Sequence, residues 1–211
     1  MLSIQCLAEG DGDVRALPVL LRRLVRLIAP GQPFTIPRVI RAKSGQVLRG
    51  DWRHLELAAG IGRHLPDQPA AILVLLDTDG KFCPAQRGPV LLGEVRKCAG
   101  AMPCDLVLAE CEFETWFLAA AESLAGQRGL PHDLCAPPAP ETIRGAKEWL
   151  SCRMPAGRRY RETIDQPELA AIFDLEMARR NSPSFDKFWR AVEGLLRELT
   201  RSGGDVPFAL H

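Results

Sequence analysis

The chain of 211 residues lacks the spacings that mark zinc sites and disulfide frameworks. Its seven cysteines are odd in number and include no C-x-x-C pair, and its four histidines include no H-E-x-x-H or other paired metal spacing. A structural zinc site and a disulfide-stapled fold are therefore not expected. Unpaired cysteines suit a reducing compartment, so we expect a cytoplasmic protein.

Long apolar runs are missing as well. No uninterrupted apolar stretch approaches the roughly 20 residues that a membrane helix needs. The first apolar run is broken at Glu9, which is not the pattern of a signal peptide. We therefore expect a protein that does not enter a membrane.

An excess of charge of one sign is also absent, because 27 Lys and Arg balance 26 Asp and Glu to a formal net charge of +1. This balance excludes a strongly basic surface that coats nucleic acid, although it leaves a local contact open. Arginine outnumbers lysine by 22 to 5. Arginine suits bidentate contacts with phosphate, but a GC-rich genome explains the same bias more simply. Neither a Walker A motif nor a complete G-x-G-x-x-G is present, so the chain is not expected to bind ATP or a dinucleotide by itself.

The apolar pattern that is present predicts alternating strands and helices. Strands are expected at residues 2–8, 34–40, 70–76 and 105–109, and helices at 17–28, 52–64, 90–98 and 115–125. Pro37 places the second strand at an edge or a bulge. Strands separated by helices in this way predict β-α-β units and a parallel sheet.

The composition changes after Gly126. Residues 127–165 are rich in Pro, Gly and Arg and contain one expected short helix, at 141–150. Helices are then expected at 167–180 and 183–201, followed by a loose tail of some ten residues. We therefore expect an α/β core over residues 1–125 and, over residues 126–211, a Pro/Arg-rich loop with helices that pack on the core.

Carboxylates follow each of the three most apolar strands. They are Glu9 and Asp13, then Asp77 and Asp79, then Glu110, Glu112 and Glu114. In an open parallel sheet the functional crevice lies outside the carboxyl ends of the strands, so these acids should meet at one edge. Close carboxylates repel by roughly 1 to 4 kcal/mol per pair, and a hard cation such as Mg²⁺ or Mn²⁺ would offset this repulsion. Solvated loops also carry acids, and three such clusters together weaken that simpler interpretation.

Two of these clusters carry a resemblance. Glu9-Gly10 with Asp13, and Asp77-x-Asp79, resemble the Toprim fold, which topoisomerases, primases and the overcoming-lysogenisation-defect (OLD) nucleases share. The chain resembles still more closely a bacterial family of domains of unknown function, number four-two-seven-six. The similar segments are C-L-A-E-G-D-G-D (6–13), L-V-L-L-D-T-D (73–79), E-F-E-T-W-F-L-A (112–119), G-A-K-E-W-L (145–150), Y-R-E-T-I-D-Q (160–166) and S-P-S-F-D-K-F (182–188).

The resemblance implies a Toprim-like, or Rossmann-like, parallel sheet flanked by helices, with a helical C-terminal extension. It also implies that one or two Mg²⁺ or Mn²⁺ ions are held by Asp77 and Asp79. Glu9 would be a metal ligand or a general acid/base, and Asp13 an additional catalytic acid as in the OLD-type enzymes.

The same resemblance extends to residues further along the chain. Glu112 or Glu114 would complete a second metal site, and Lys147 is the candidate for a catalytic lysine, with Lys43 next. The implied function is Mg²⁺-dependent phosphodiester cleavage, by a nuclease of a bacterial anti-phage defence or mobile-element system. An AAA- or ABC-type ATPase is the implied partner, and a homodimer is compatible with the family.

A basic run around the only tyrosine is the candidate contact for nucleic acid. Arg158, Arg159 and Arg161 flank Tyr160 and could follow a phosphate backbone. A solvated loop explains the same run. Strand passage of the topoisomerase type is not expected, because the tyrosine nucleophile would need a further domain for which these residues leave no room.

Two other functions stay open at this point. One is a non-catalytic binding or accessory subunit with the same fold. The other is a phosphatase of the haloacid-dehalogenase type, whose D-x-D-G-T start is similar to Asp77-Thr78-Asp79-Gly80. That motif has Lys81 in place of Thr and follows the third strand instead of the first, which weakens the phosphatase hypothesis.

Overall fold

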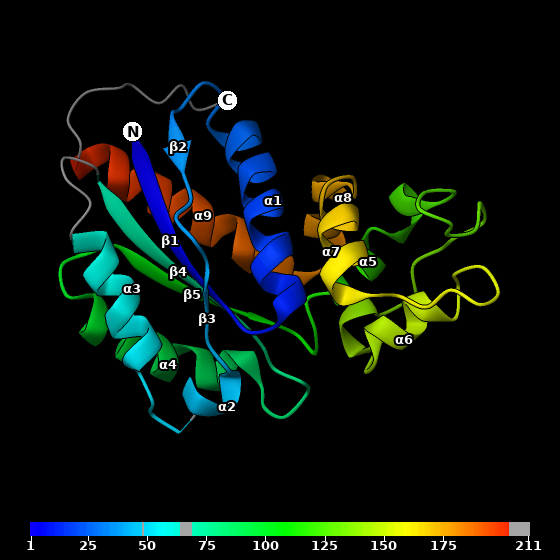
Figure 1. Ribbon diagram of the computed structural model, residues 1–211, viewed down its shortest axis with the longest axis horizontal. Coiled ribbons are helices and arrows are strands. Elements are labelled where there is room, and N and C mark those ends of the chain that lie inside the picture. The colour runs from blue at the N-terminus through cyan, green and yellow to red at the C-terminus, as the bar shows by residue number, and fades with distance from the viewer. Residues whose placement is uncertain (48, 64–68, 203–211) are drawn as a thin grey trace.

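A parallel β-sheet forms the centre of the computed structural model, which describes residues 1–47, 49–63 and 69–202 (Figure 1). The five strands in these ranges are β1 (Leu2–Ala8), β2 (Phe34–Thr35), β3 (Ile40–Arg41), β4 (Ala70–Asp77) and β5 (Cys104–Ala109). They pair in the order β2-β1-β4-β5, and β3 also pairs with β1. Every pairing is parallel, which confirms the predicted α/β class.

The register of the central strands decides which residues leave the sheet together. Ala8 of β1 pairs with Leu75 of β4, and Asp77 at the end of β4 pairs with Ala109 of β5. Because the strands are parallel, Glu9, Asp77 and the residues after Ala109 emerge at the same edge. The sheet thus brings the three predicted acidic clusters to one end.

The expected strand at 34–40 is interrupted in the structure. Only its two ends pair with β1, as the short strands β2 and β3. Pro37 lies between them, and a proline has no backbone N–H to donate to a strand ladder. The edge position is confirmed, and the single continuous strand is wrong.

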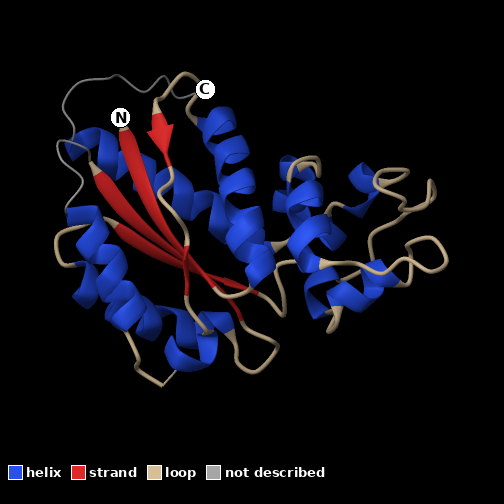
Figure 2. Cartoon of the chain, viewed as in Figure 1, coloured by secondary structure: helices blue, strands red, loops and turns tan. Residues whose placement is uncertain are grey.

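Helices cover both faces of the sheet, as Figures 1 and 2 show. On one face lie α1 (Asp11–Ile28) and α9 (Pro183–Ser202), which pack against Leu73 and Leu75 of β4. On the other lie α3 (Arg53–Arg63) and α4 (Pro84–Ala99), which pack against Ile72, Val74 and Leu76. A single turn, α2 (Ser44–Val47), precedes α3. Alternate apolar side chains of β4 thus pack into two separate cores, one on each face of the sheet.

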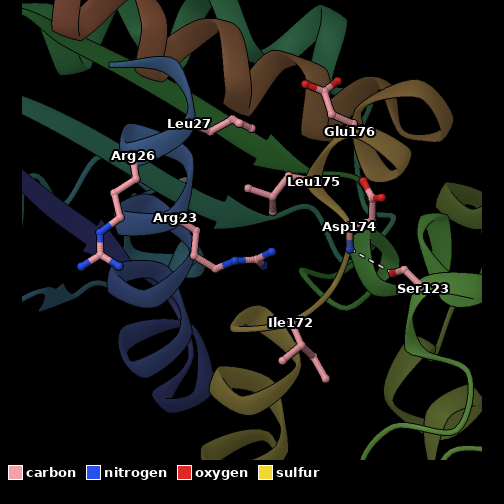
Figure 3. A pocket seen from close by; sticks show the side chains of 8 residues that line it. All are labelled: Arg23, Arg26, Leu27, Ser123, Ile172, Asp174, Leu175 and Glu176. Carbon is pink, nitrogen blue, oxygen red and sulfur yellow. Dashed lines mark hydrogen bonds between the residues drawn. The ribbon is translucent and has the colours of Figure 1, made fainter. Parts of the chain in front are cut away.

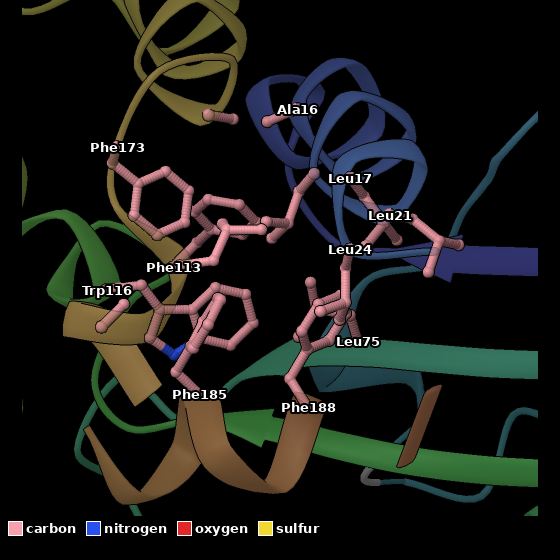
Figure 4. Packing of buried hydrophobic residues seen from close by; sticks show 14 of the residues in the cluster. Ala16, Leu17, Leu21, Leu24, Leu75, Phe113, Trp116, Phe173, Phe185 and Phe188 are labelled. Atoms are coloured by element: carbon pink, nitrogen blue, oxygen red, sulfur yellow. The ribbon is translucent and has the colours of Figure 1, made fainter. Parts of the chain in front are cut away.

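Aromatic side chains fill the core on the α1 and α9 side (Figure 4). Trp116 packs against Phe185 and Phe188 of α9, each with ring centroids 5.2 Å away. Its indole N–H donates a hydrogen bond of 2.8 Å to the Ser184 hydroxyl, so the buried ring has no unpaired donor. The C-terminal helix is therefore part of the packed core.

Short helices gather at one end of the sheet (Figure 1). They are α5 (Thr115–Ala119), η1 (Ala121–Leu124), η2 (Pro140–Thr142), α6 (Ala146–Ser151), α7 (Glu162–Ala170) and α8 (Leu175–Asn181). The helix expected at 115–125 changes to a 3-10 turn at η1, and the helix expected at 141–150 begins only after Gly145, whose φ is +81°.

The helix expected at 167–180 is wrong. α7 already begins at Glu162, so that Pro167 lies inside it, and it ends before Asp174. Asp174 then accepts a hydrogen bond from the Met177 N–H and caps α8. The apolar pattern thus predicts one continuous helix, whereas the capping carboxylate of Asp174 divides this segment into two.

Three further expectations from the sequence concern the cysteines, membrane-spanning helices and the C-terminal tail. All seven cysteines carry free thiols, in line with the absence of a disulfide framework. None of the helices in the described ranges has the length and apolar character to cross a membrane. The tail that was expected to be loose, residues 203–211, lies outside the described residues.

Candidate functional site

Four acidic side chains and one lysine gather at the carboxyl ends of β1 and β4. Glu9 follows β1 and is half-buried, and Asp13 is buried in the first turn of α1. Asp77 is the last residue of β4, 8% exposed, and the fully buried Glu114 precedes α5. Lys147 comes from α6 (Ala146–Ser151). We call these five residues the carboxylate site.

The pKa of Asp77 shows that these groups act on one another. Burial raises the pKa of this carboxyl well above its usual range, and the negative charges of Asp13, Glu114 and Glu9 raise it further. Lys147 acts in the opposite direction. The ionised carboxylates are therefore unfavourable in this buried place, which holds one nearby lysine, and a bound cation would favour their ionisation.

Glu114 is the most deeply buried member of the carboxylate site. Its Oε1 accepts a hydrogen bond of 3.0 Å from the Tyr160 hydroxyl, and its Oε2 has no hydrogen-bond partner among the described residues. Burial raises the pKa of Glu114 to about 8, with Asp13 adding to the shift and Lys147 opposing it. A buried carboxyl with one unsatisfied oxygen is costly unless it is protonated or meets a further partner.

Backbone and side-chain donors orient the other two buried carboxylates. The two oxygens of Asp13 accept hydrogen bonds from the Gly10 N–H, at 2.9 Å, and from Gln166 Nε2, at 2.6 Å. The Asp77 Oδ1 accepts the Phe113 N–H at 3.0 Å, which ties the end of β4 to the segment after β5. These bonds fix the directions in which the remaining lone pairs point.

Lys147 is held by acidic residues on two segments. Its ammonium lies 3.2 Å from Glu162 Oε2, and its backbone N–H donates to Glu112 Oε2 at 3.4 Å. Burial by itself lowers the pKa of Lys147, but the charges of Glu114, Glu112 and Glu162 outweigh burial and raise it. Lys147 is therefore a fixed positive charge at neutral pH. The second-choice lysine, Lys43, is exposed beyond β3.

Asp79, predicted as a metal ligand, does not join the carboxylate site. Its side chain is 42% exposed and forms an ion pair of 2.7 Å with Lys81. Its backbone is left-handed, with a φ of +50°, and so is that of Cys111, with a φ of +60°. The Asp79 N–H donates to the Cys111 carbonyl, so these two strained residues brace each other at the sheet edge.

Two of the three arginines predicted to contact nucleic acid bond within the molecule. Arg158 forms an ion pair with the buried Asp165 and donates to the Arg128 carbonyl. The Arg161 backbone N–H also donates to Asp165, at 2.7 Å. Arg159 is exposed. The contact of this segment with nucleic acid stays a prediction, for which Arg159 is the best placed of the three.

Two residues with contacts to the carboxylate site had no role in the sequence-based hypothesis. Gln166 bonds Asp13 and Tyr160 bonds Glu114, and both come from the Y-R-E-T-I-D-Q segment. The only signal for them in the sequence is their place within that segment. Their partners lie 153 and 46 residues away, so helical or strand periodicity could not reveal the contacts.

The donor set of the carboxylate site fits Mg²⁺ or Mn²⁺ in kind. It consists of carboxylate oxygens, the ligands that such hard ions prefer, and the Glu114 Oε2 still lacks a hydrogen-bond partner among the described residues. Within the described ranges, however, no three acidic, histidine or cysteine side chains already stand together as metal ligands. Side-chain rotation would therefore have to bring the carboxylates together around an ion.

A surface cavity of about 680 Å³ lies elsewhere, between α1, η1 and the start of α8 (Figure 3). Its lining includes Arg23, Leu27 and Asp174. Arg23 is ten residues beyond Asp13 on α1, which is about 15 Å along the helix axis. This cavity is therefore separate from the carboxylate site.

Comparison with known proteins adds a family and no named relative. No curated protein and no solved structure gives a significant match to the chain. A protein-family model described as Domain of unknown function (DUF4276) matches residues 8–193, which is most of the chain. The match spans the whole carboxylate site, from Glu9 to Lys147. The chain therefore belongs to the DUF4276 family of domains of unknown function.

Proposed function

We propose that the chain is a Toprim-like, Mg²⁺- or Mn²⁺-dependent phosphodiesterase that cleaves nucleic acid. The observation that supports this function best is the carboxylate site itself. Three separate segments carry Glu9, Asp77 and Glu114 to the carboxyl edge of a parallel sheet, where burial and neighbouring carboxylates raise the pKa of Asp77 and Glu114. Such an arrangement is unfavourable without a compensating cation, and functional sites commonly hold such unfavourable groups.

Four residues have a task in this mechanism. Asp77 and Glu9 would hold the cation, together with Asp79 once it has left Lys81. When bound, the ion would offset the charge of a phosphodiester and lower the pKa of a water molecule. Glu9, which is half-buried, would accept a proton from that water. Lys147 can donate to a phosphate oxygen from the same side as Glu114.

The proposed substrate and partners rest on other grounds than the carboxylate site. The exposed Arg159 and its neighbours offer positive charge to a nucleic-acid backbone near α7. The role in bacterial defence or in a mobile element, and the AAA- or ABC-type ATPase partner, rest on the resemblance to the Toprim and OLD-type proteins. Cytoplasmic location and a homodimer belong to the same proposal.

One observation favours a second candidate function, a non-catalytic binding subunit. No three carboxylates of the described chain are already at metal-binding separation. If the carboxylate site never closes around a cation, Lys147 and the arginines remain as a surface that binds an anionic partner without turnover.

Incubation of the purified chain with nucleic acid separates the two functions. Supercoiled DNA, single-stranded DNA and RNA are incubated with Mg²⁺, Mn²⁺ or EDTA, with and without a partner ATPase. We expect cleavage that requires the cation and that falls at least about a hundredfold in Asp77→Asn, because the loss of even an outer-shell partner costs about 10- to 100-fold. Asp133→Asn, the same change at an exposed loop position, is the matched control.

Two outcomes would contradict the phosphodiesterase. Cleavage that persists in Asp77→Asn at the wild-type rate would remove the carboxylate site from the chemistry. An absence of cleavage in every condition, together with retained binding of nucleic acid, would support the binding subunit.

A further inference from the structure

The segment from Tyr160 to Gln166 sends two polar side chains into the carboxylate site. Gln166 is 1% exposed and donates its Nε2–H to Asp13 Oδ1 at 2.6 Å. Tyr160 is 9% exposed and donates its hydroxyl to Glu114 Oε1 at 3.0 Å. Both bonds join a buried donor to a buried carboxylate. The Gln166 bond links α7 to α1, and the Tyr160 bond links the segment before α7 to the residue before α5.

The bond from Gln166 continues to the turn that carries Glu9. The second oxygen of Asp13 accepts the Gly10 N–H at 2.9 Å. Gln166 therefore orients a carboxylate that in turn holds the backbone directly after Glu9. A loss of the amide would free Asp13 to rotate, and the Gly10 N–H would lose a well-placed acceptor.

Gly12 allows α1 and α7 to approach each other closely. A Cβ atom at Gly12 would collide with Gln166 Oε1 and lie only 3.0 Å from Glu162 Cβ. The first turn of α1 can thus meet α7 closely only because residue 12 has no side chain. The contact between Gln166 and Asp13 is therefore a feature of the packing between α1 and α7 and does not depend on a flexible surface side chain.

We propose that Gln166 and Tyr160 are positioning residues of the carboxylate site, which fix the orientations of Asp13 and Glu114 beside a divalent cation that Glu9 and Asp77 would hold. For the cation this inference rests on the proposed function. The positioning itself is a property of the cation-free chain. Partners of this kind orient metal-binding carboxylates, and their loss typically lowers metal affinity about 10- to 100-fold.

The positioning is tested first without metal. In Gln166→Met, a side chain of similar length lacks the amide, so the Gly10 N–H should exchange with solvent at least about tenfold faster, measured by NMR. Leu169→Ala on the same helix is the control, because it loosens the apolar packing of α7 and leaves the amide in place. Gln166→Asn, whose amide is one methylene too short, replaces Gln166→Met if that variant does not fold. Unchanged Gly10 exchange in a folded variant would overturn the positioning.

The cation is then titrated as Mn²⁺, with calorimetry for affinity and electron paramagnetic resonance for ligand geometry. We expect Gln166→Met and Tyr160→Phe to bind Mn²⁺ about 10- to 100-fold more weakly with an altered spectrum, and Leu169→Ala to keep the wild-type spectrum. If both variants keep the wild-type affinity and spectrum, the inference about Gln166 and Tyr160 is overturned and the proposed function is not. A wild-type chain that binds no Mn²⁺ would refute the proposed function, and faster Gly10 exchange in Gln166→Met would still support the positioning.

Discussion

At the scale of single residues, burial decides the behaviour of the charged groups. Glu114 and Asp77 sit where water cannot stabilise their ionised forms, and both carboxyl pKa values are raised. Asp79, two residues beyond Asp77, shares an exposed ion pair with Lys81 that contributes little to stability. Asp77 and Asp79 therefore differ in their chemistry although they lie only two residues apart.

Glu114 should make the cation-free protein less stable as the pH rises. The folded chain keeps the Glu114 proton up to a pKa of about 8, whereas the unfolded chain loses it near 4.5. The stabilisation is complete below pH 4.5 and is lost as the pH rises to 8, by up to about 1.4 kcal/mol per pH unit. Urea unfolding in EDTA from pH 5 to 8 measures this slope. Glu114→Gln should flatten it while keeping an acceptor for Tyr160, and identical slopes in both proteins would be inconsistent with a buried, titrating Glu114.

Arg158 and Arg159 are adjacent but should respond differently to truncation. Arg158→Ala leaves the buried Asp165 with the Arg161 backbone N–H and a more distant guanidinium at 3.7 Å. We expect a loss of roughly 1 to 3 kcal/mol in the free energy of unfolding, the usual cost of a buried group that loses its partner. The exposed Arg159→Ala should leave stability unchanged and weaken nucleic-acid binding. Equal stability of the two variants by urea unfolding would show that the ion pair with Asp165 does not support the fold.

At the scale of elements, the close packing of α1 on α7 sets the shape of the carboxylate site. These two helices are far apart in the sequence, and they make extensive contact in the structure. Asp13 on one and Gln166 on the other meet at this contact. A change that breaks the contact between Asp13 and Gln166 should therefore disturb the site before it disturbs the sheet.

Gly12 and Gly93 provide a matched pair of helix substitutions. Gly12→Ala places a Cβ against Gln166 and Glu162 and should lower the free energy of unfolding by about 1 to 3 kcal/mol. A Cβ at Gly93 on α4 meets nothing within 4 Å, so Gly93→Ala should raise it by roughly 0.5 to 1 kcal/mol through helix propensity. Both values come from thermal or urea unfolding. A stabilising effect of Gly12→Ala would mean that α1 and α7 are not closely packed in solution.

The elements also show why sequence patterns predict some features and miss others. The strands at 2–8, 70–76 and 105–109 are predictable because a strand covered on both faces is mostly apolar, and Ser3, Gln5 and Asp105 are the only polar residues in them. The break between α7 and α8 is not, because Asp174 acts as a helix cap only in the folded chain. The gathering of acids at one sheet edge follows from parallel topology, which the alternation of strands and helices indicates.

The details of the carboxylate site needed the three-dimensional structure. The bond from Gln166 to Asp13 spans 153 residues, and nothing local in either segment encodes it. The ion pair of Asp79 with Lys81 is local, but a D-x-D motif looks the same whether its second carboxylate faces a metal or a lysine. Glu114 could be predicted as an acid near the sheet edge, and its complete burial could not.

At the scale of the whole molecule, the protein joins a doubly covered parallel sheet to a group of short helices at the sheet's carboxyl end. α9 packs against the sheet and completes the aromatic core, and Ser182, just before this helix, and Ser184 in its first turn donate hydrogen bonds to Glu141. The sheet, α9 and the short helices thus form a rigid frame around a few buried carboxylates. The proposed cation site would need only side-chain rotation to close around an ion.

The most direct test of the divalent-cation site is a calorimetric titration of the wild-type chain with Mn²⁺ at pH 7, repeated in buffers of different ionisation enthalpy. We predict binding that releases protons, since a cation in the site favours the ionised forms of Glu114 and Asp77, whose pKa values are raised in the cation-free chain. Asp77→Asn should bind at least about tenfold more weakly, whereas Asp133→Asn should bind as the wild type does. No binding heat, or equal affinity in wild type and Asp77→Asn, would contradict a divalent-cation site at this edge of the sheet.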